Sequence, residues 1–257
     1  MPKTTWPDIL STADRIESAR AKTRQAVTHL LEILALHENN AIIVYSNKLA
    51  KQIPQSLGAN AFNTFQQSMH RYEIVRICAL WDSADPAKEN ISTIIQLIKS
   101  DAVIKRLGLE MERFWGGFDG SILNPSADPE LAQIERLAFK ASEQAFGKKQ
   151  GAKVRQKLRG AISLFDKTHR SPKVLALHNL RDKRLAHLLS HTRREKHGPI
   201  DAVKYGDESK LLDVSVRVVE ALYLGVCGTS FNFGDSRRID RKYAKALWGA
   251  CTFKGVK

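Results

Sequence analysis

Apolar residues recur at helical spacing along most of this 257-residue chain, and this periodicity restricts its fold more than any other feature does. Side chains three and four positions apart lie on one face of an α-helix. The pattern covers residues 7–38 and 59–82, and a shorter stretch over 40–53 ends before Pro54. Apart from the short stretch 230–234, no segment alternates apolar and polar residues as a β-strand does. The sequence therefore predicts an all-α bundle of about seven to nine helices.

Several helix starts can be located in the sequence. An aspartate or serine can accept hydrogen bonds from the first amides of a helix, and a following proline lacks the amide that would stay unpaired there. Three such dipeptides occur, namely Asp85-Pro86, Asp128-Pro129 and Ser171-Pro172. For the last two helices we expect Asp207 and Ser236 to be the caps.

The chain is strongly basic, with a formal net charge of +14 and a sequence pI near 9.8. Between Lys140 and Lys196, lysine and arginine outnumber the acids by about sixteen to about four. Such an excess favours a polyanionic partner, nucleic acid first and an anionic membrane surface second. A basic protein without such a partner is the alternative. Five of the eight histidines lie in or beside the same region: His169, His178, His187, His191 and His197.

The remaining composition favours a protein of the cytoplasm. The three cysteines, Cys78, Cys227 and Cys251, are far apart and form neither a metal-binding pair nor a disulfide framework, so we expect reduced thiols. The N-terminal residues lack the basic and apolar regions of a signal peptide. The longest apolar run, residues 41–45, is far shorter than the roughly 18 residues that span a membrane.

The stretch "NLRDKRLAHLLSHT" places charged residues inside an otherwise amphipathic pattern. If residues 172–194 form one helix, Arg181 lies on the apolar face between Leu177 and Leu185, with Leu188 farther along the same face. A guanidinium group cannot lose its proton in a protein. Its burial therefore requires a carboxylate, several carbonyl groups, or a cleft that admits an anion.

On the same expected helix, His187 lies about 120° around the axis from Arg181 and roughly 9 Å along it. It shares its face with Lys183, Arg184, His191 and Arg194. Cations at such positions disfavour the imidazolium form, so that a neutral, proton-accepting imidazole persists near neutral pH, whereas a bound phosphate acts in the opposite direction. This is the setting of a histidine that cleaves phosphodiesters.

Other kinds of site fit the sequence less well. His187 and His191 have the spacing of two zinc ligands on a helix, but the glutamate of H-E-x-x-H and a third ligand are missing. The chain has neither the G-x-S-x-G turn of serine hydrolases nor a glycine-rich phosphate-binding loop. A histidine considered alone is most often an ordinary surface or core residue, so the prediction depends on its combination with Arg181. We predict no metal site and no cofactor.

That combination resembles the motif of the HEPN superfamily of all-α proteins, in which an arginine and a polar residue precede a histidine by a few positions. Here it reads Arg181-Asp182-Lys183-Arg184-Leu185-Ala186-His187. Both "LRDKRLAHL" and the segment "RYEIVRICALWDSADPAKENISTIIQLI" (71–98) are similar to the abortive-infection, Abi-U-type branch. The resemblance covers about residues 10–225, which we take as the core of a single all-α HEPN-like domain over 1–257. Residues 235–257 are then a basic helical extension.

The resemblance implies metal-independent RNA cleavage by a homodimer in which two motif helices face each other across a composite cleft. It implies that Arg181 binds the scissile phosphate, that His187 activates the 2′-hydroxyl or protonates the leaving 5′-oxygen, and that Asp182 orients a neighbouring group. A symmetric interface along the apolar face would also account for Arg181 there. The residues expected to contact RNA are Lys183, Arg184, His191, Arg193 and Arg194.

We therefore predict a cytoplasmic HEPN-type endoribonuclease that acts in phage defence (abortive infection) or as a toxin and leaves a 2′,3′-cyclic phosphate. The expected partners are RNA and a second copy of the chain, with an antitoxin or a nucleotidyltransferase as a further candidate. One alternative is a non-catalytic HEPN-like dimer that binds RNA or a partner protein. Another is a protein that binds an anionic membrane surface through residues 140–196, although this region lacks the aromatic face of interfacial helices.

Overall fold

The computed structural model describes residues 6–45, 47–52, 58–117 and 126–251, and within these ranges it contains helices and no β-strand. The predicted all-α class is confirmed. None of the described helices is both long and apolar enough to cross a membrane. The α-helices are α1 (Thr12–Tyr45), α2 (Asn47–Gln52), α3 (Ala59–Leu80), α4 (Ile91–Ile98), α5 (Asp101–Gly116), α6 (Pro129–His169), α7 (Pro172–Leu180), α8 (Asp207–Cys227) and α9 (Phe233–Ala250). Short 3₁₀-helices cover Trp6–Ile9 and Arg194–His197.

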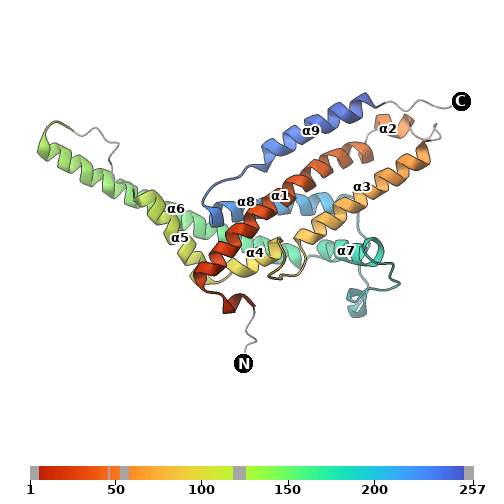
Figure 1. Ribbon diagram of the computed structural model, residues 1–257, viewed down its shortest axis with the longest axis horizontal. Helices are drawn as coiled ribbons and strands as arrows, with labels where there is room; N and C mark the ends of the chain where they lie inside the picture. The colour runs from red at the N-terminus through yellow and green to blue at the C-terminus, as the bar shows by residue number, and fades with distance from the viewer. Residues whose placement is uncertain (1–5, 46, 53–57, 118–125, 252–257) are drawn as a thin grey trace.

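The helices pack around α1 (Figure 1). Helices α9, α1 and α3 lie side by side, with α1 in the middle. Helix α8 packs along both α1 and α6, and α4 packs against α1 and α6. Helix α6 runs back along α5, and the two helices form an antiparallel pair. The short helix α7 contacts α3, α6 and α8, and carries the chain into the segment with the predicted motif.

The hydrophobic core holds the end of α3 in place. Trp81, which is fully buried, stacks on Phe165 of α6 with ring centroids 5.3 Å apart. Its indole Nε1 donates a hydrogen bond of 2.8 Å to the hydroxyl of Ser215 on α8. This packing fixes the position of Asp82, the next residue along the chain. Buried residues of α1, α4, α5 and α8 complete this core, among them Leu30, Ile33, Leu34, Ile94, Leu97, Ile98, Val103, Leu107, Val218 and Leu222.

Two of the three predicted proline starts are confirmed. Asp128 and Ser171 accept hydrogen bonds from first-turn amides of α6 and α7, respectively. The predicted start at Asp85-Pro86 is wrong. Asp85 accepts a hydrogen bond from the amide of Ala87 in a turn, and α4 begins only after Asn90, whose side chain caps it. The carboxylate of Asp85 is bonded within this turn, and it caps no helix.

The caps predicted for the last two helices are wrong. Gly206, in the left-handed region at φ +86°, precedes α8. Asp207 is already the first residue of that helix, and its carboxylate accepts a hydrogen bond from the amide of Lys204. Asn232 caps α9, with its side chain accepting from the amide of Gly234 at 2.9 Å. Ser236 therefore lies inside α9.

Helix α1 is continuous where the sequence predicted a break near residue 39. The helix predicted over 40–53 is in fact the end of α1 followed by the short α2. A distant helix stabilises this continuation, because the buried carboxylate of Glu38 accepts hydrogen bonds from Arg237 and Arg241 of α9. These hydrogen bonds lower the pKa of Glu38 even though burial raises it. The polar residues at this point are therefore part of a helix–helix contact.

Glycines allow α5 and α6 to approach closely. A Cβ atom at Gly147 would lie 2.4 Å from the carbonyl oxygen of Glu112, and one at Gly151 would lie 2.6 Å from that of Gly108. Residues 143–146 of α6 still pack against the end of α5, and the part of α6 before them extends away from the other helices (Figure 1). The side chains of residues 129–146 are exposed or half-buried.

Replacing Gly147 by alanine should destabilise the protein, whereas the same change at Gly160 in the same helix should stabilise it. The new methyl group at 147 overlaps the backbone of α5, which should cost about 1–3 kcal/mol. A Cβ atom at Gly160 meets nothing within 4 Å, so alanine there should add about 0.5–1 kcal/mol through helix propensity. Urea-induced unfolding of both variants measures the difference. Changes of the same sign would contradict this account of the α5–α6 contact.

Candidate functional site

The predicted motif does not lie on one regular helix. The expectation of a single helix over 172–194 is wrong, since α7 ends at Leu180 and one π-helical turn covers Arg181–Leu185. Residues 186–193 form no helix. The expected apolar face ends with this turn, and Leu188, predicted to lie on that face, is 92% exposed.

Backbone and side-chain hydrogen bonds define this change of conformation. The amide of Ala186 donates to the carbonyl of Arg181 at 2.8 Å, five residues back, which is the π-helical pattern. The chain then returns to α7, because the hydroxyl of Thr192 donates to the side-chain oxygen of Asn179 at 2.5 Å. Glu195 accepts from the side-chain amide of Asn179 at 3.1 Å and from the amide of Thr192 at 2.8 Å. Residues 186–191 are thereby held as an exposed loop against the end of α7.

Arg181 lies between two carboxylates. Its Nη1 donates to Oδ1 of Asp82 at 2.6 Å, and its Nε donates to Oδ1 of Asp182 at 2.9 Å. The side chain is only 14% exposed. On its other oxygen, Asp182 accepts a hydrogen bond from Arg194. Arg181, Asp182 and Arg194, three of the predicted site residues, are therefore brought together, with Asp82 from the end of α3. We call these four residues the arginine cluster.

The arginine cluster is electrically balanced, because its two guanidinium groups face two carboxylates. Burial raises the pKa of Asp182, but the hydrogen bonds from Arg181 and Arg194 outweigh burial and hold that pKa below its usual value. Burial lowers the pKa of Arg181, whereas its bonds to Asp82 and Asp182 raise it, with a net increase. Arg181 and Asp182 are thus both charged at neutral pH. The cluster has no formal excess of positive charge with which to attract a polyanion.

A second ion pair lies beside the arginine cluster. The Lys183 ammonium donates to Oε1 of Glu195 at 2.8 Å. This bond, with the amide of Thr192 and the side chain of Asn179, lowers the pKa of Glu195 to about 2. The Nδ1 atom of His191, a largely exposed side chain, lies 3.7 Å from Oε2 of the same glutamate. Lys183 and His191 therefore lie beside the carboxylate of Glu195, whereas Arg181 pairs with other carboxylates.

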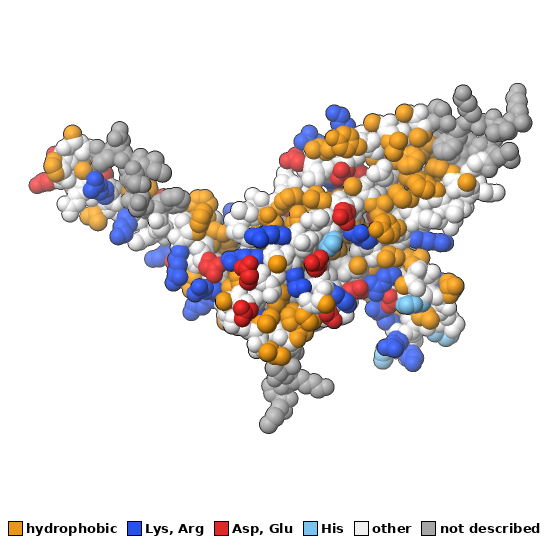
Figure 2. Space-filling model, viewed as in Figure 1, with side chains coloured by type: hydrophobic (Ala, Val, Ile, Leu, Met, Phe, Trp, Pro, Cys, Tyr) orange, Lys and Arg blue, Asp and Glu red, His pale blue; other side chains and the backbone are white. Residues whose placement is uncertain are grey.

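The other predicted site residues, His187, Arg184 and Arg193, are exposed. Within the described parts of the chain none of their side chains forms a hydrogen bond or an ion pair. His187 lies in the loop that follows the π-helical turn. The segment after α7 forms a lobe of the molecule where lysine, arginine and histidine side chains gather (Figures 1 and 2). His187 therefore forms no hydrogen bond or ion pair with the arginine cluster within the described residues.

The sequence did not identify two residues of this site, Asp82 and His178. A signal for Asp82 was present, because a buried Arg181 requires a carboxylate and the long third helix ends in an acidic segment at 82–89. His178 is 5% exposed and its Nδ1 lies 3.6 Å from Oδ1 of Asp82. Burial, reinforced by the nearby Arg181, nevertheless lowers the pKa of His178 to about 4 and keeps its ring neutral.

The depressed pKa of His178 predicts a loss of stability in acid. The unfolded chain binds a proton on this histidine near pH 6.5, whereas the folded chain does so only near pH 4. The contribution to the free energy of unfolding is complete above about pH 6.5 and declines as the pH falls towards 4. Between pH 7 and 4.5 the wild-type protein should lose roughly 2 kcal/mol more than His178→Gln does. Urea-induced unfolding at both pH values measures this, with the exposed His191→Gln as the matched control. An equal acid loss in the wild type and His178→Gln would contradict the assignment.

Within the described ranges neither the histidines nor the cysteines form a recognisable metal centre. Residues 186–193 are not helical, so His187 and His191 do not share the helical face that the zinc spacing requires. Among the residues that the structure describes, no three or more His, Cys, Asp or Glu side chains are arranged to hold a metal ion. The three cysteines are unpaired, and burial raises the pKa of Cys78 to about 12.

Comparison with known proteins identifies the family. The sequence matches the HEPN_AbiU2 family, described as AbiU2, over residues 16–247, which is most of the chain and includes most of α9. No curated protein and no solved structure matches it. The predicted motif from Arg181 to His187 and the segment 71–98 both lie inside the matched region. The chain therefore belongs to the AbiU2 family of HEPN proteins.

Proposed function

We propose that this protein is a metal-independent endoribonuclease of the HEPN type, acting in the cytoplasm in phage defence or as a toxin. The observation that carries the proposal is the placement of Arg181, which Asp82 and Asp182 hold at the start of a loop that presents an exposed His187. Membership of the AbiU2 family supports the assignment. An antitoxin or a nucleotidyltransferase is a candidate regulatory partner.

The proposed reaction is an internal transfer at phosphorus. The 2′-hydroxyl of RNA loses its proton to a general base and attacks the adjacent phosphate, and the bond to the 5′-oxygen breaks as that oxygen receives a proton. The products are a 2′,3′-cyclic phosphate and a 5′-hydroxyl. His187 acts as the base or the acid, and Arg181 stabilises the negative charge that develops on the phosphate oxygens. Asp182 is a positioning residue, because it accepts from both Arg181 and Arg194.

Arg181 keeps hydrogen-bonding capacity for a phosphate. A guanidinium group has five N–H donors. The contacts with Asp82 and Asp182 involve one N–H on each of Nε, Nη1 and Nη2 at most. Two donors on the terminal nitrogens therefore have no partner among the described residues. The two carboxylates fix the plane of the group, so that these donors are oriented before RNA binds.

A second copy of the chain completes the proposed site. Leu188 is 92% exposed and its neighbour Leu189 is 39% exposed, so the loop that carries His187 presents apolar side chains to solvent. An interface between two such loops would bury these leucines and bring His187 of one copy towards the arginine cluster of the other. We propose a homodimer of this kind, which Leu188→Asp should dissociate in sedimentation-equilibrium measurements.

RNA cleavage in the presence of EDTA tests the function. The purified wild-type protein should cleave a labelled RNA in EDTA and leave 2′,3′-cyclic phosphate ends. His187→Ala should reduce the rate by about 10²–10⁴-fold, because it removes a general acid or base. His197→Ala is the matched control, since it removes an exposed histidine of the same segment that is not among the residues expected to contact RNA.

The outcomes separate the proposal from its alternatives. Loss of wild-type cleavage in EDTA would exclude the metal-independent mechanism, and equal rates for the wild type and His187→Ala would exclude this site. RNA binding that weakens with salt, survives His187→Ala and occurs without cleavage would identify a non-catalytic binding dimer instead.

A further inference from the structure

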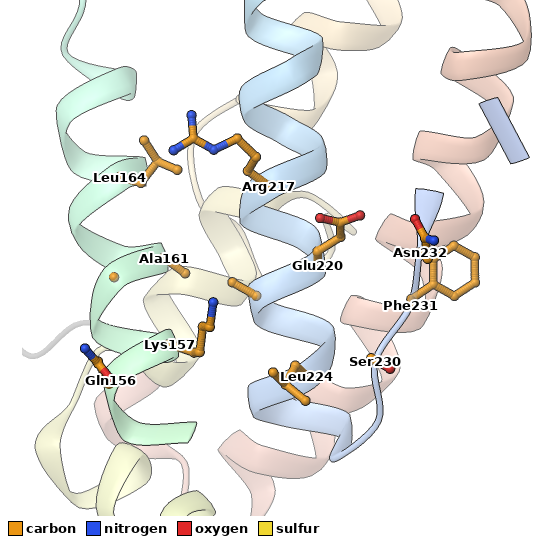
Figure 3. Close-up of a pocket in the computed structure, with 12 residues that line it drawn as sticks. Gln156, Lys157, Ala161, Leu164, Arg217, Glu220, Leu224, Ser230, Phe231 and Asn232 are labelled. Carbon is orange, nitrogen blue, oxygen red and sulfur yellow. The ribbon is translucent and has the colours of Figure 1, made fainter. Parts of the chain in front are cut away.

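A groove runs between α6 and α8, away from the predicted motif. It encloses a cavity of about 790 Å³, and the segment that joins α8 to α9 closes one side of it (Figure 3). Lys157, Gly160 and Leu164 of α6 form one wall, while Arg217 and Glu220 of α8 form the opposite wall. Figure 3 shows the side chains of Lys157 and Arg217 in the space between the two helices.

The two cations of this groove outnumber its one carboxylate, that of Glu220. Lys157 and Arg217 are exposed, and neither forms an ion pair with any carboxylate that the structure describes. The carboxylate of Glu220 accepts a hydrogen bond of 3.3 Å from the amide of Phe233. This differs from the motif region, where the cations of the arginine cluster and Lys183 are matched by carboxylates. The groove therefore offers what the arginine cluster lacks, an excess of positive charge.

The positive charge continues along α6. Lys149 and Lys153 precede Lys157 at intervals of four residues, so the three lysines follow one side of the helix, and all are exposed. Successive lysines are about 6 Å apart along the axis. A row of this kind that leads into a groove with two cations suits an extended polyanion better than a small ion.

Gly160 keeps the wall of the groove open. Glycine is unfavourable inside a helix, and at Gly147 and Gly151 the packing against α5 accounts for it. At Gly160 no atom lies within 4 Å of an added Cβ, so no contact with the described residues explains this glycine. The missing side chain leaves room beside Lys157, where a ligand backbone could approach α6.

We infer that the α6–α8 groove binds the sugar–phosphate backbone of single-stranded RNA, outside the cleavage site. The inference deepens the proposed function and rests on it for the identity of the polyanion. Phe231, an aromatic residue of the lining, is already packed against Tyr223 and Phe233 at centroid distances of 5.7 and 4.7 Å. The groove therefore contacts phosphates rather than stacking on bases, and its binding is independent of RNA sequence.

Salt-dependent RNA binding tests the inference. The probe is a fluorescent single-stranded RNA, and the protein is the full chain with His187→Ala, so that binding is measured without cleavage. Lys157→Gln combined with Arg217→Gln should reduce the slope of log affinity against log salt by about 1.4, because each lost phosphate contact removes about 0.7. At about 0.1 M salt this corresponds to roughly 25-fold weaker binding.

Two comparisons control for charge and shape. Lys99→Gln combined with Lys105→Gln removes the same charge from exposed residues that do not line the groove. This variant should keep nearly all of the affinity and most of the slope. Gly160→Leu should weaken binding without a change of charge, by filling the groove, while Gly160→Ala should retain binding. Thermal unfolding of each variant verifies that it is folded.

The possible results are decisive in both directions. If the groove variant matches the Lys99 and Lys105 variant in slope and affinity, the groove does not bind RNA. If the wild-type protein binds RNA but does not cleave it, the proposed function fails while the salt series still decides on the groove. If the wild type binds no RNA at all, both are overturned.

Discussion

Replacing Arg181 by alanine is expected to slow RNA cleavage by about 10²–10³-fold, the usual cost of removing a group that stabilises transition-state charge. The variant loses the donors that face the phosphate. It also leaves the carboxylates of Asp82 and Asp182 with one guanidinium group, that of Arg194, where there were two. The excess negative charge should further repel the substrate. Single-turnover cleavage at saturating protein separates the chemical step from binding.

A double-mutant cycle with Asp82 shows whether this carboxylate acts through Arg181. Asp82→Asn should slow cleavage by about ten- to a hundredfold, because the charged acceptor that fixes Nη1 of Arg181 at 2.6 Å is replaced by a neutral and weaker one. Arg181→Ala combined with Asp82→Asn should be no slower than Arg181→Ala alone. Asp85→Asn, in the same segment but bonded only to backbone amides and hydroxyl groups, is the matched control. Effects that multiply in the double variant would show that Asp82 acts independently of Arg181.

The largest loss of stability is expected for Trp81→Ala, at about 3–5 kcal/mol. The change removes a fully buried indole from its stack on Phe165 and leaves the hydroxyl of Ser215 without the Nε1 donor. Trp248→Ala is the matched control. Trp248 is only partly buried, although its Nε1 also donates a hydrogen bond, to Asn39 at 2.9 Å. Urea-induced unfolding measures both variants. A loss for Trp81→Ala no larger than that for Trp248→Ala would contradict the central role assigned to Trp81.

The features that the sequence predicted correctly are determined by nearby residues. Helix α3 was expected over 59–82 and covers Ala59–Leu80. The caps Asp128 and Ser171 satisfy amides two or three positions away, so their effect requires no knowledge of the rest of the fold. The family resemblance was equally local, since it depended on short strings whose order and spacing are visible in the sequence.

The predictions that failed depend on contacts between distant residues. The polar stretch around Glu38 remains helical because Arg237 and Arg241, about 200 positions away, satisfy its buried carboxylate. Similarly, the apolar pattern around Arg181 favoured a continuous helix. That pattern contains no information about Asp82, 99 residues away, or about the ring of bonds through Glu195. Charge pairing across the fold decided both cases, and periodicity does not report it.

The 41-residue helix α6 has a consequence for how the assembly of this protein is measured. At 1.5 Å per residue the helix is about 60 Å long. A compact chain of this size has a radius of gyration of only about 18 Å. The chain exposes 15893 Å² of surface, whereas a compact monomer of 28.8 kDa exposes about 11300 Å². A particle of this shape has a large hydrodynamic radius, so a monomer elutes early from a gel-filtration column and mimics a dimer. Only a method that reports mass directly, such as light scattering or sedimentation equilibrium, distinguishes one copy from two.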